Sequence, residues 1–168
     1  MYKRILVPLD GSALAEQVLP IATRLVCARH AVLYLAQIND LLYEAETCQE
    51  RLNGHFAKIV QRHLVLDETY LAKLALSLQF QQIDVRTIVC TGPIVPTLLE
   101  ISRVYHCGLI MLSSHGAENN GAQQLGSVAE RILAESSVPV LISSHESNKR
   151  EIISARMQAI QSEFIGIA

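Results

Sequence analysis

Five short apolar runs, each bounded by Gly, Pro, Ser or Asp, divide the chain up to residue 143. They occupy residues 5–7, 32–35, 85–89, 109–112 and 138–142. Short, mainly apolar runs of this kind are typical of strands that are buried on both faces of a sheet. Stretches with helical spacing lie between them, at 12–29, about 47–81, about 95–106 and 127–136. This alternation predicts a parallel α/β sheet whose strands are joined by right-handed helical crossovers.

The end of the chain has a different pattern. After the fifth run the sequence becomes polar, SSHESNKRE, and then apolar residues recur at alternating spacings of four and three. They are Ile153, Met157, Ile160, Phe164 and Ile167. A narrow seam of this kind suits a helix that docks on a groove or a partner helix, or one that packs on its own domain. We therefore expect an α/β domain at 1–144 and a C-terminal amphipathic helical extension at 145–168.

The composition indicates a single domain that associates with itself. A chain of 168 residues fits one domain. Apolar residues make up 50% of it and charged residues only 18%, against a usual share of about 25%, and the mean hydropathy is +0.27. The formal net charge is −2, with acids and bases interspersed, so we expect neither nucleic acid nor an anionic membrane as a partner.

Targeting and cysteine patterns point to a reducing compartment. The apolar run before Asp10 is too short for a signal-peptide core, and no stretch approaches the length of a membrane span. The four cysteines include no C-x-x-C pair, so we expect reduced thiols and not a zinc site or a disulfide framework. The sequence therefore predicts a cytoplasmic protein.

Residues 111–130, MLSSHGAENNGAQQLGSVAE, form the most informative stretch. The spacing of Gly116 and Gly121 is that of a P-loop, but Ala122 and Gln123 stand where Lys and Ser/Thr are required. No G-x-G-x-x-G follows the first run, which excludes the common dinucleotide motif. The stretch is therefore either a different phosphate-binding loop or a connection that only caps the next helix.

The phosphate-binding hypothesis rests on the end of one predicted strand and the start of the helix that follows it. The fourth run would deliver Ser113 to His115 at the carboxyl end of the sheet, where ligands of open α/β folds bind. Gly116 allows a close turn, and Gly126-Ser127 would open a helix whose N–H groups attract an anion. The alternative is that Ser127-Val128-Ala129-Glu130 is a capping box for that helix.

Asp10 follows the first run and would face the same end of the sheet. Its carboxylate could hold Mg²⁺, which a triphosphate would need because no Lys or Arg lies between Arg103 and Arg131. The alternative for Asp10-Gly11-Ser12 is a turn that ends in a helix N-cap at Ser12.

With these stretches in place, the chain resembles the universal stress protein family over residues 1–143. The resemblance is carried by ILVPLDGS at the start, by Gly92, and by LIMLSSHG and LGSVAERILAESSVPVLI near the end. It implies a doubly wound sheet of five parallel strands in the order 3-2-1-4-5, with helices on both faces. It also implies a nucleotide site with the signature G-x-x-G, nine residues, then G-S/T.

The resemblance assigns roles to individual residues of this chain. Gly116, Gly126 and Ser127 match phosphate-contacting positions, Asp10 matches an acidic residue near the ribose and metal, and Gln37 matches an adenine contact. We place the remaining nucleotide contacts at Pro8, Leu9, Leu112, Ser113, His115 and Val128. Ser113 replaces the first glycine of the signature, and Ala117 stands where the family often has Arg.

The fifth run also predicts a dimer. Pro139 lacks an N–H group, which suits an edge strand or the start of a strand and not a central strand, and an exposed apolar edge must be covered. The resemblance implies that Val138, Val140 and Ile142 pair across a two-fold axis with a second copy. An additional protein partner is left open.

These observations lead to three functional hypotheses. The first is a cytoplasmic, homodimeric stress-response protein that binds ATP with Mg²⁺ as a sensor or switch. The second is a nucleotide-free dimeric interaction module, and the third is a protein that binds AMP or cyclic AMP. No G-x-S-x-G elbow or metal-ligand spacing of histidines is present, so we expect at most slow ATP hydrolysis.

Overall fold

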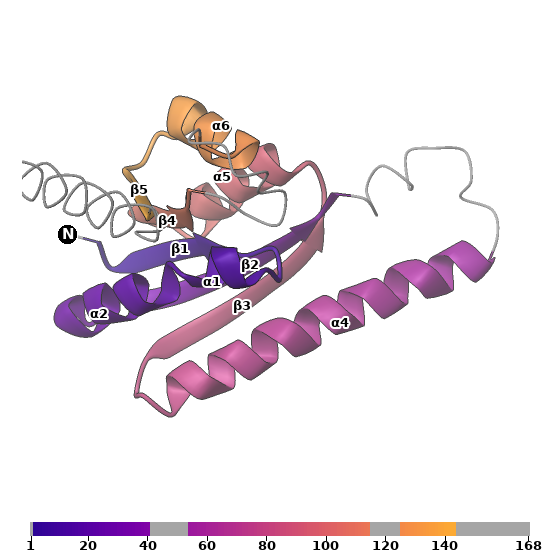
Figure 1. The fold of residues 1–168 in the computed structure, drawn as a ribbon, viewed down its shortest axis with the longest axis horizontal. Helices are drawn as coiled ribbons and strands as arrows, with labels where there is room; N and C mark the ends of the chain where they lie inside the picture. Colours follow the sequence, from indigo (N-terminus) through magenta and orange to yellow (C-terminus); the bar gives the residue numbers. More distant parts are fainter. Residues whose placement is uncertain (1, 41–53, 115–124, 144–168) are drawn as a thin grey trace, which may run out of the picture.

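The computed structural model describes residues 2–40, 54–114 and 125–143. These residues contain five strands in one parallel sheet, with the order β3-β2-β1-β4-β5 (Figure 1). The strands are β1 (Arg4–Pro8), β2 (Val32–Asn39), β3 (Asp84–Thr91), β4 (Leu109–Ser113) and β5 (Val140–Ser143). The predicted strand order is therefore confirmed. The predicted C-terminal extension at 145–168 lies outside the described residues.

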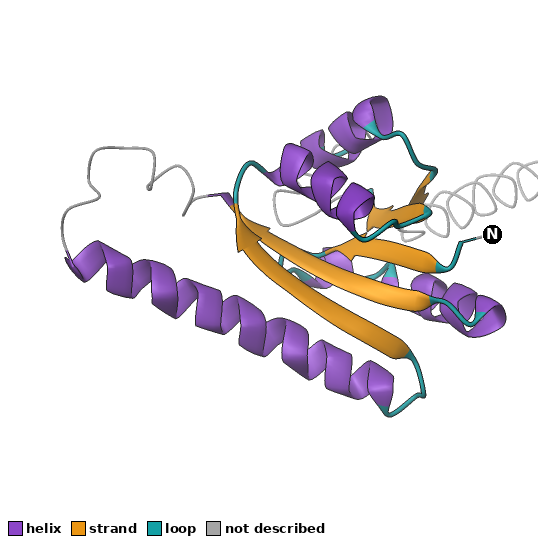
Figure 2. Ribbon diagram, turned by 180° about the vertical axis from the view of Figure 1, so that it is seen from behind, coloured by secondary structure: helices purple, strands orange, loops and turns teal. Residues whose placement is uncertain are grey.

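Helices cover both faces of the sheet (Figure 2). They are α1 (Ala13–Glu16), α2 (Leu19–Arg29), α4 (Gly54–Gln79), α5 (Ile94–Val104) and α6 (Ser127–Glu135). Side chains of α1, α2 and α4 pack on one face, and those of α5 and α6 on the other. The doubly wound arrangement is confirmed. None of these helices is long and apolar enough to cross a membrane.

The helical stretch predicted at 12–29 is two helices. α1 ends at a C-cap on Gln17, and Pro20 lies in the first turn of α2. Because proline has no N–H group, it cannot continue a helix but is well tolerated where a new one begins. The apolar spacing runs on through this break, which is why periodicity alone did not separate the two helices.

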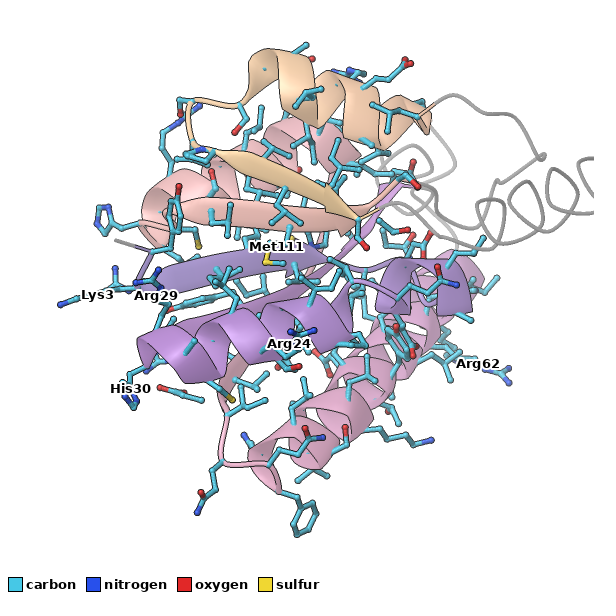
Figure 3. The ribbon with its side chains drawn as sticks, turned by 60° about the vertical axis from the view of Figure 1, so that its left-hand side comes forward. Lys3, Arg24, Arg29, His30, Arg62 and Met111 are labelled. Carbon is cyan, nitrogen blue, oxygen red and sulfur yellow. The ribbon has the colours of Figure 1, made fainter. Side chains whose placement is uncertain are left out.

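The core has two layers, one on each side of the sheet. Leu33 and Leu35 of β2 pack in the layer beneath α2 and α4, and Tyr34 and Ala36 pack in the layer beneath α5 and α6. Met111 lies at the centre of the sheet, while the charged side chains labelled in Figure 3 point outward. Because successive strand residues point to opposite faces, each position of β2 belongs to one layer.

The two edges of the sheet differ. β5 is one outer strand; among the described strands it pairs with β4 alone, and its four residues are half-buried. β3 is the other outer strand, and α4 packs beside it. The prediction that the fifth run forms an edge strand is confirmed, although Val138 and Pro139 precede the strand.

Candidate functional site

A cavity of about 550 Å³ opens at the carboxyl ends of β1, β2 and β4, on the side of the sheet that α5 and α6 cover. Eight residues predicted to contact a nucleotide line it: Pro8, Leu9, Asp10, Leu112, Ser113, Gly126, Ser127 and Val128. Its volume lies within the range of roughly 300–1,000 Å³ typical of small-molecule sites. Residues from 8 to 128 thus meet at one place, as expected for an open α/β sheet.

The start of α6 forms one wall of this cavity. Gly126 is the N-cap in extended conformation, and its N–H donates to the carbonyl of Ser114 at 2.8 Å. The first N–H to donate within the helix is that of Glu130, to the carbonyl of Gly126 at 3.0 Å. The N–H groups of residues 127–129 are therefore those that a helix start offers to caps or ligands.

The predicted capping box at Ser127 is wrong. Ser127 is the first helical residue, and the N-cap position belongs to Gly126, which has no side chain to cap the helix. A cap must have non-helical backbone, so a hydroxyl one position further on cannot serve as the predicted N-cap.

Asp10 has two roles in the geometry. Its Oδ1 accepts a hydrogen bond from the N–H of Ser12 at 2.9 Å, and Ser12 Oγ accepts from the N–H of Ala15 at 3.1 Å. The predicted turn with an N-cap at Ser12 is confirmed, and Gly11 provides its positive φ of 81°. Asp10 also lines the cavity. The turn therefore holds the carboxylate in place while leaving it among the cavity residues.

Gln37 requires a correction. It was predicted to contact the adenine, but it belongs to the α4 side of the sheet, where its Nε2 donates to Asp67 Oδ1 at 2.8 Å. The cavity is lined instead by Ala36, Ile38 and Asp40. A one-residue shift along a strand moves a side chain to the opposite face. The side chain that faces the cavity at the end of β2 is therefore that of Ile38 and not that of Gln37.

A polar cluster ties α4 to the end of β2 on that opposite side. Asp67 also accepts from Asn39 Nδ2 at 3.1 Å, so one carboxylate binds two amides of the same strand. The buried Oε1 of Gln37 has no hydrogen-bond partner among the described residues. The cluster is a structural connection between a helix and a strand and does not line the cavity.

Tyr70 makes a second link, from α4 to α1. Its hydroxyl donates to Glu16 Oε1 at 2.9 Å. Burial raises the pKa of the Tyr70 phenol well above its usual value, and the hydrogen bond and charge of Glu16 and the charge of Asp10 raise it further. The phenol therefore stays protonated as a donor.

The charge of the cavity is negative. Asp10 and Asp40 line it, at the ends of neighbouring strands, and no Lys or Arg occurs among its described lining residues. Within the described part of the chain, no group of three His, Cys, Asp or Glu residues could hold a metal ion. A bound phosphate would therefore depend on backbone N–H groups and on a cation that accompanies it.

Two predicted site residues, His115 and Gly116, lie outside the described residues. Sequence reasoning missed several that line the cavity, among them Asp40 and the α5 residues Ile94 and Leu98. Strand alternation could have identified Ile38, because it shares a face with Tyr34 and Ala36. The α5 residues gave no separate signal, since they continue the apolar pattern of a core helix.

Comparison with known protein families gives a match to the Universal stress protein family over residues 1–144. The chain belongs to the universal stress protein family. The match covers every described strand of the sheet and all the residues that line the cavity. It confirms the resemblance inferred from the motifs at the two ends of the domain.

Solved structures show that the fold of this universal stress protein recurs. The hypothetical protein MJ0577 has a TM-score of 0.76 at 22% identity, with 88% of this chain and 99% of that chain covered. UspA from Lactobacillus plantarum has a TM-score of 0.73 at 15% identity, with coverage of 84% and 97%. A universal stress protein in complex with cAMP has a TM-score of 0.61 at 19% identity, with coverage of 85% and 97%. No curated protein matches the sequence.

Proposed function

We propose that this universal stress protein binds ATP together with Mg²⁺ in the cavity at the carboxyl end of its sheet. One observation carries the proposal: residues that the sequence assigned to a nucleotide, from Pro8 to Val128, line a single cavity beside the start of α6. Family membership supports it, and so does a relative that was solved in complex with cAMP.

Different lining residues would contact different parts of the ligand. The phosphates would lie at the start of α6, where Gly126 adds no side chain and the first-turn N–H groups have no acceptor within the helix. Mg²⁺ would offset the phosphate charge, with Asp10 as its protein ligand. Asp40, which also lines the cavity, would add a second negative charge that favours a cation. The adenine would pack against the apolar end of β2, at Ala36 and Ile38.

AMP or cyclic AMP is the second candidate. The absence of Lys and Arg from the described cavity lining favours a ligand with fewer negative charges than ATP. The relative in complex with cAMP supports this candidate as well. The two candidates differ in their need for a metal, because a monophosphate has less charge to offset.

We propose that the protein acts in the cytoplasm as a stress-response sensor or switch, in a homodimer formed through β5. The support for the dimer is the position of β5 at the sheet edge, where Val140 and Ile142 stay half-buried. Binding and release of the nucleotide, and not its chemistry, would carry the signal, with hydrolysis at most slow.

The test is calorimetric titration with ATP, AMP and cyclic AMP, each with and without Mg²⁺. We expect saturable ATP binding that is much weaker without Mg²⁺, is lost in Gly126→Val, and is tighter in Ser113→Gly. Ser143→Gly is a matched control, because Ser143 pairs with Ser113 in the sheet but does not line the cavity.

Each other outcome has a defined meaning. Binding of AMP or cyclic AMP that does not need Mg²⁺, with weaker binding of ATP, would replace the first candidate by the second. No heat at millimolar nucleotide, with Ser113→Gly equally silent, would contradict nucleotide binding and support the dimeric interaction module.

A further inference from the structure

α4 and the residue that follows it carry a stripe of exposed side chains on the side that faces away from the sheet. We call it the outer seam; its members are Ile59, Arg62, Leu66, Thr69, Lys73, Leu76 and Phe80, at alternating spacings of three and four residues. All seven are exposed, and Leu66, Leu76 and Phe80 are 56%, 57% and 88% accessible. The seam is about 32 Å long at the usual rise of about 1.5 Å per residue.

The opposite side of α4 packs in the core and uses other residues than the outer seam. Leu71, Ala75 and Leu78 are buried against the sheet and satisfy the helix's need for an apolar face. α4 lies beside β3 at the edge of the molecule in both ribbon views (Figures 1 and 2), and Arg62 points away from it (Figure 3). The outer seam is thus a second apolar face that the described residues do not cover.

A second apolar face on a surface helix is unusual. The outer side of such a helix is ordinarily polar, yet five of the ten large apolar side chains that the described residues expose lie in α4 or directly after it. The spacing of three and four is that of a coiled-coil seam, which buries its apolar residues against another helix. The seam therefore has the geometry of a helix-pairing surface.

The charges of the seam restrict the orientation in which two copies could pair. Arg62 and Lys73 are its charged members, and it contains no acid. A parallel pairing of two copies would place Arg62 against Arg62 and Lys73 against Lys73, which is destabilising. An antiparallel pairing of residues 62–80 that is symmetric about residue 71 avoids both contacts.

We propose that the outer seam of α4 docks against the same seam of a second copy of this chain, antiparallel and across a two-fold axis. In this register Leu66 of one copy meets Leu76 of the other, Arg62 meets Phe80, and Thr69 meets Lys73. A guanidinium over a phenyl ring is favourable, and each contact occurs twice, as an isologous interface requires. No cation faces a cation at any position of the seam.

This contact is independent of the proposed nucleotide site and of the β5 edge. α4 lies at the β3 edge of the sheet, and β5 forms the opposite edge. A copy that used both surfaces would belong to an assembly larger than a dimer. The composition agrees, since the chain combines 50% apolar with only 18% charged residues.

The first experiment is sedimentation analysis of the full chain and of single variants at micromolar concentration. We expect Leu66→Glu and Leu76→Lys each to lower the assembly mass by at least a factor of two. Leu133→Glu is the control, because Leu133 on α6 is 53% exposed but lies outside the seam. It should leave the mass unchanged.

Mixing the two variants tests the register. At one contact of a mixed pair, the glutamate introduced into one copy lies against the lysine introduced into the other, and at the symmetric contact the two native leucines meet again. Mixing Leu66→Glu with Leu76→Lys should therefore recover the mass that each variant lost, which non-specific apolar association would not do.

Two results would overturn the proposal. One is an unchanged mass in Leu66→Glu with the protein folded by circular dichroism. The other is loss of binding to phosphatidylserine vesicles in Leu66→Glu without any change in mass, which would make the seam a membrane-binding surface. Failure of the mixture to recover its mass would overturn the register.

Discussion

The two faces of the sheet differ at the carboxyl end of β2. On one side, Gln37 and Asn39 donate hydrogen bonds to Asp67 of α4, which connect the strand to the helix. On the other side, Ala36, Ile38 and Asp40 border an open cavity of about 550 Å³. Five consecutive residues thus contribute alternately to structure and to a site.

The difference shows how a parallel sheet separates stability from binding. Strand alternation sends odd and even positions to different layers, so one layer can close while the other stays open at its end. α4 closes its side with a buried apolar face and two polar links. α6 leaves its N-terminus at the cavity, where a ligand is the natural partner of its first N–H groups.

The largest effect should come from the closed side. Leu71 of α4 is fully buried, and Leu71→Ala should lower the free energy of unfolding by about 3 kcal/mol, because a buried leucine leaves a cavity behind. Urea denaturation measures the change, with Leu133→Ala as the control, because Leu133 is an exposed residue of α6. The nucleotide affinity of the folded protein should stay the same; a parallel loss of affinity would contradict the separation.

Asp67 tests the polar link on the same side. Asp67→Ala leaves the amides of Gln37 and Asn39 without their acceptor and should destabilise the fold by about 2 kcal/mol. Asp67→Asn, which keeps one acceptor oxygen, should cost less. Glu68→Ala, at an exposed neighbouring position, is the matched control. Equal stability of Asp67→Ala and Glu68→Ala would show that the link contributes little.

The acids of the open side should affect binding more than stability, although Asp10 also holds the turn before α1. Asp10→Asn should weaken Mg²⁺-ATP binding about tenfold, or about 1.4 kcal/mol, because a ligand of the metal is lost. The same variant should bind metal-free ATP more tightly, because one repulsive charge is removed. Calorimetry in Mg²⁺ and in EDTA measures both, with Asp84→Asn at the start of β3 as the control. A change of the same sign in both conditions would argue against a metal at Asp10.

A pair of neighbouring substitutions tests the alternation directly. Ile38→Ala should weaken nucleotide binding about fivefold, since apolar contact with the adenine is reduced, whereas Gln37→Leu should change it less than about twofold, since its side chain faces α4. Fluorescence of a labelled adenine nucleotide is a suitable readout. The reverse order of effects would restore Gln37 as the adenine contact.

The smallest effect concerns Tyr70. Burial and then Glu16 hold its pKa above the usual value, so the protonated phenol is favoured in the folded state and its stabilising contribution is lost as pH rises above about 10. Glu16→Gln removes the charge and should lower the pKa of Tyr70. Ultraviolet titration against Tyr70→Phe measures it; an unchanged or higher pKa would mean that Glu16 does not act on the phenol.

The sequence was sufficient for the fold but not for the fine geometry of the site. The apolar runs and the residues Asp10, Gly126 and Ser127 predicted which strand and helix ends meet, because the carboxyl ends of parallel strands share one edge. Gln37 was misplaced because a motif match locates the end of a strand but does not establish which face of the sheet a given side chain occupies. Asp67 and Ile94 gave no signal, since their contacts depend on how helices pack across the sheet.

The most direct test of the central claim is a crystal structure of the protein grown with Mg²⁺ and a non-hydrolysable ATP analogue. We predict phosphates at the N–H groups that open α6, the metal beside Asp10, and the adenine against Ile38. A nucleotide on the Gln37 side of β2, or none in the cavity at saturating concentration, would contradict the account.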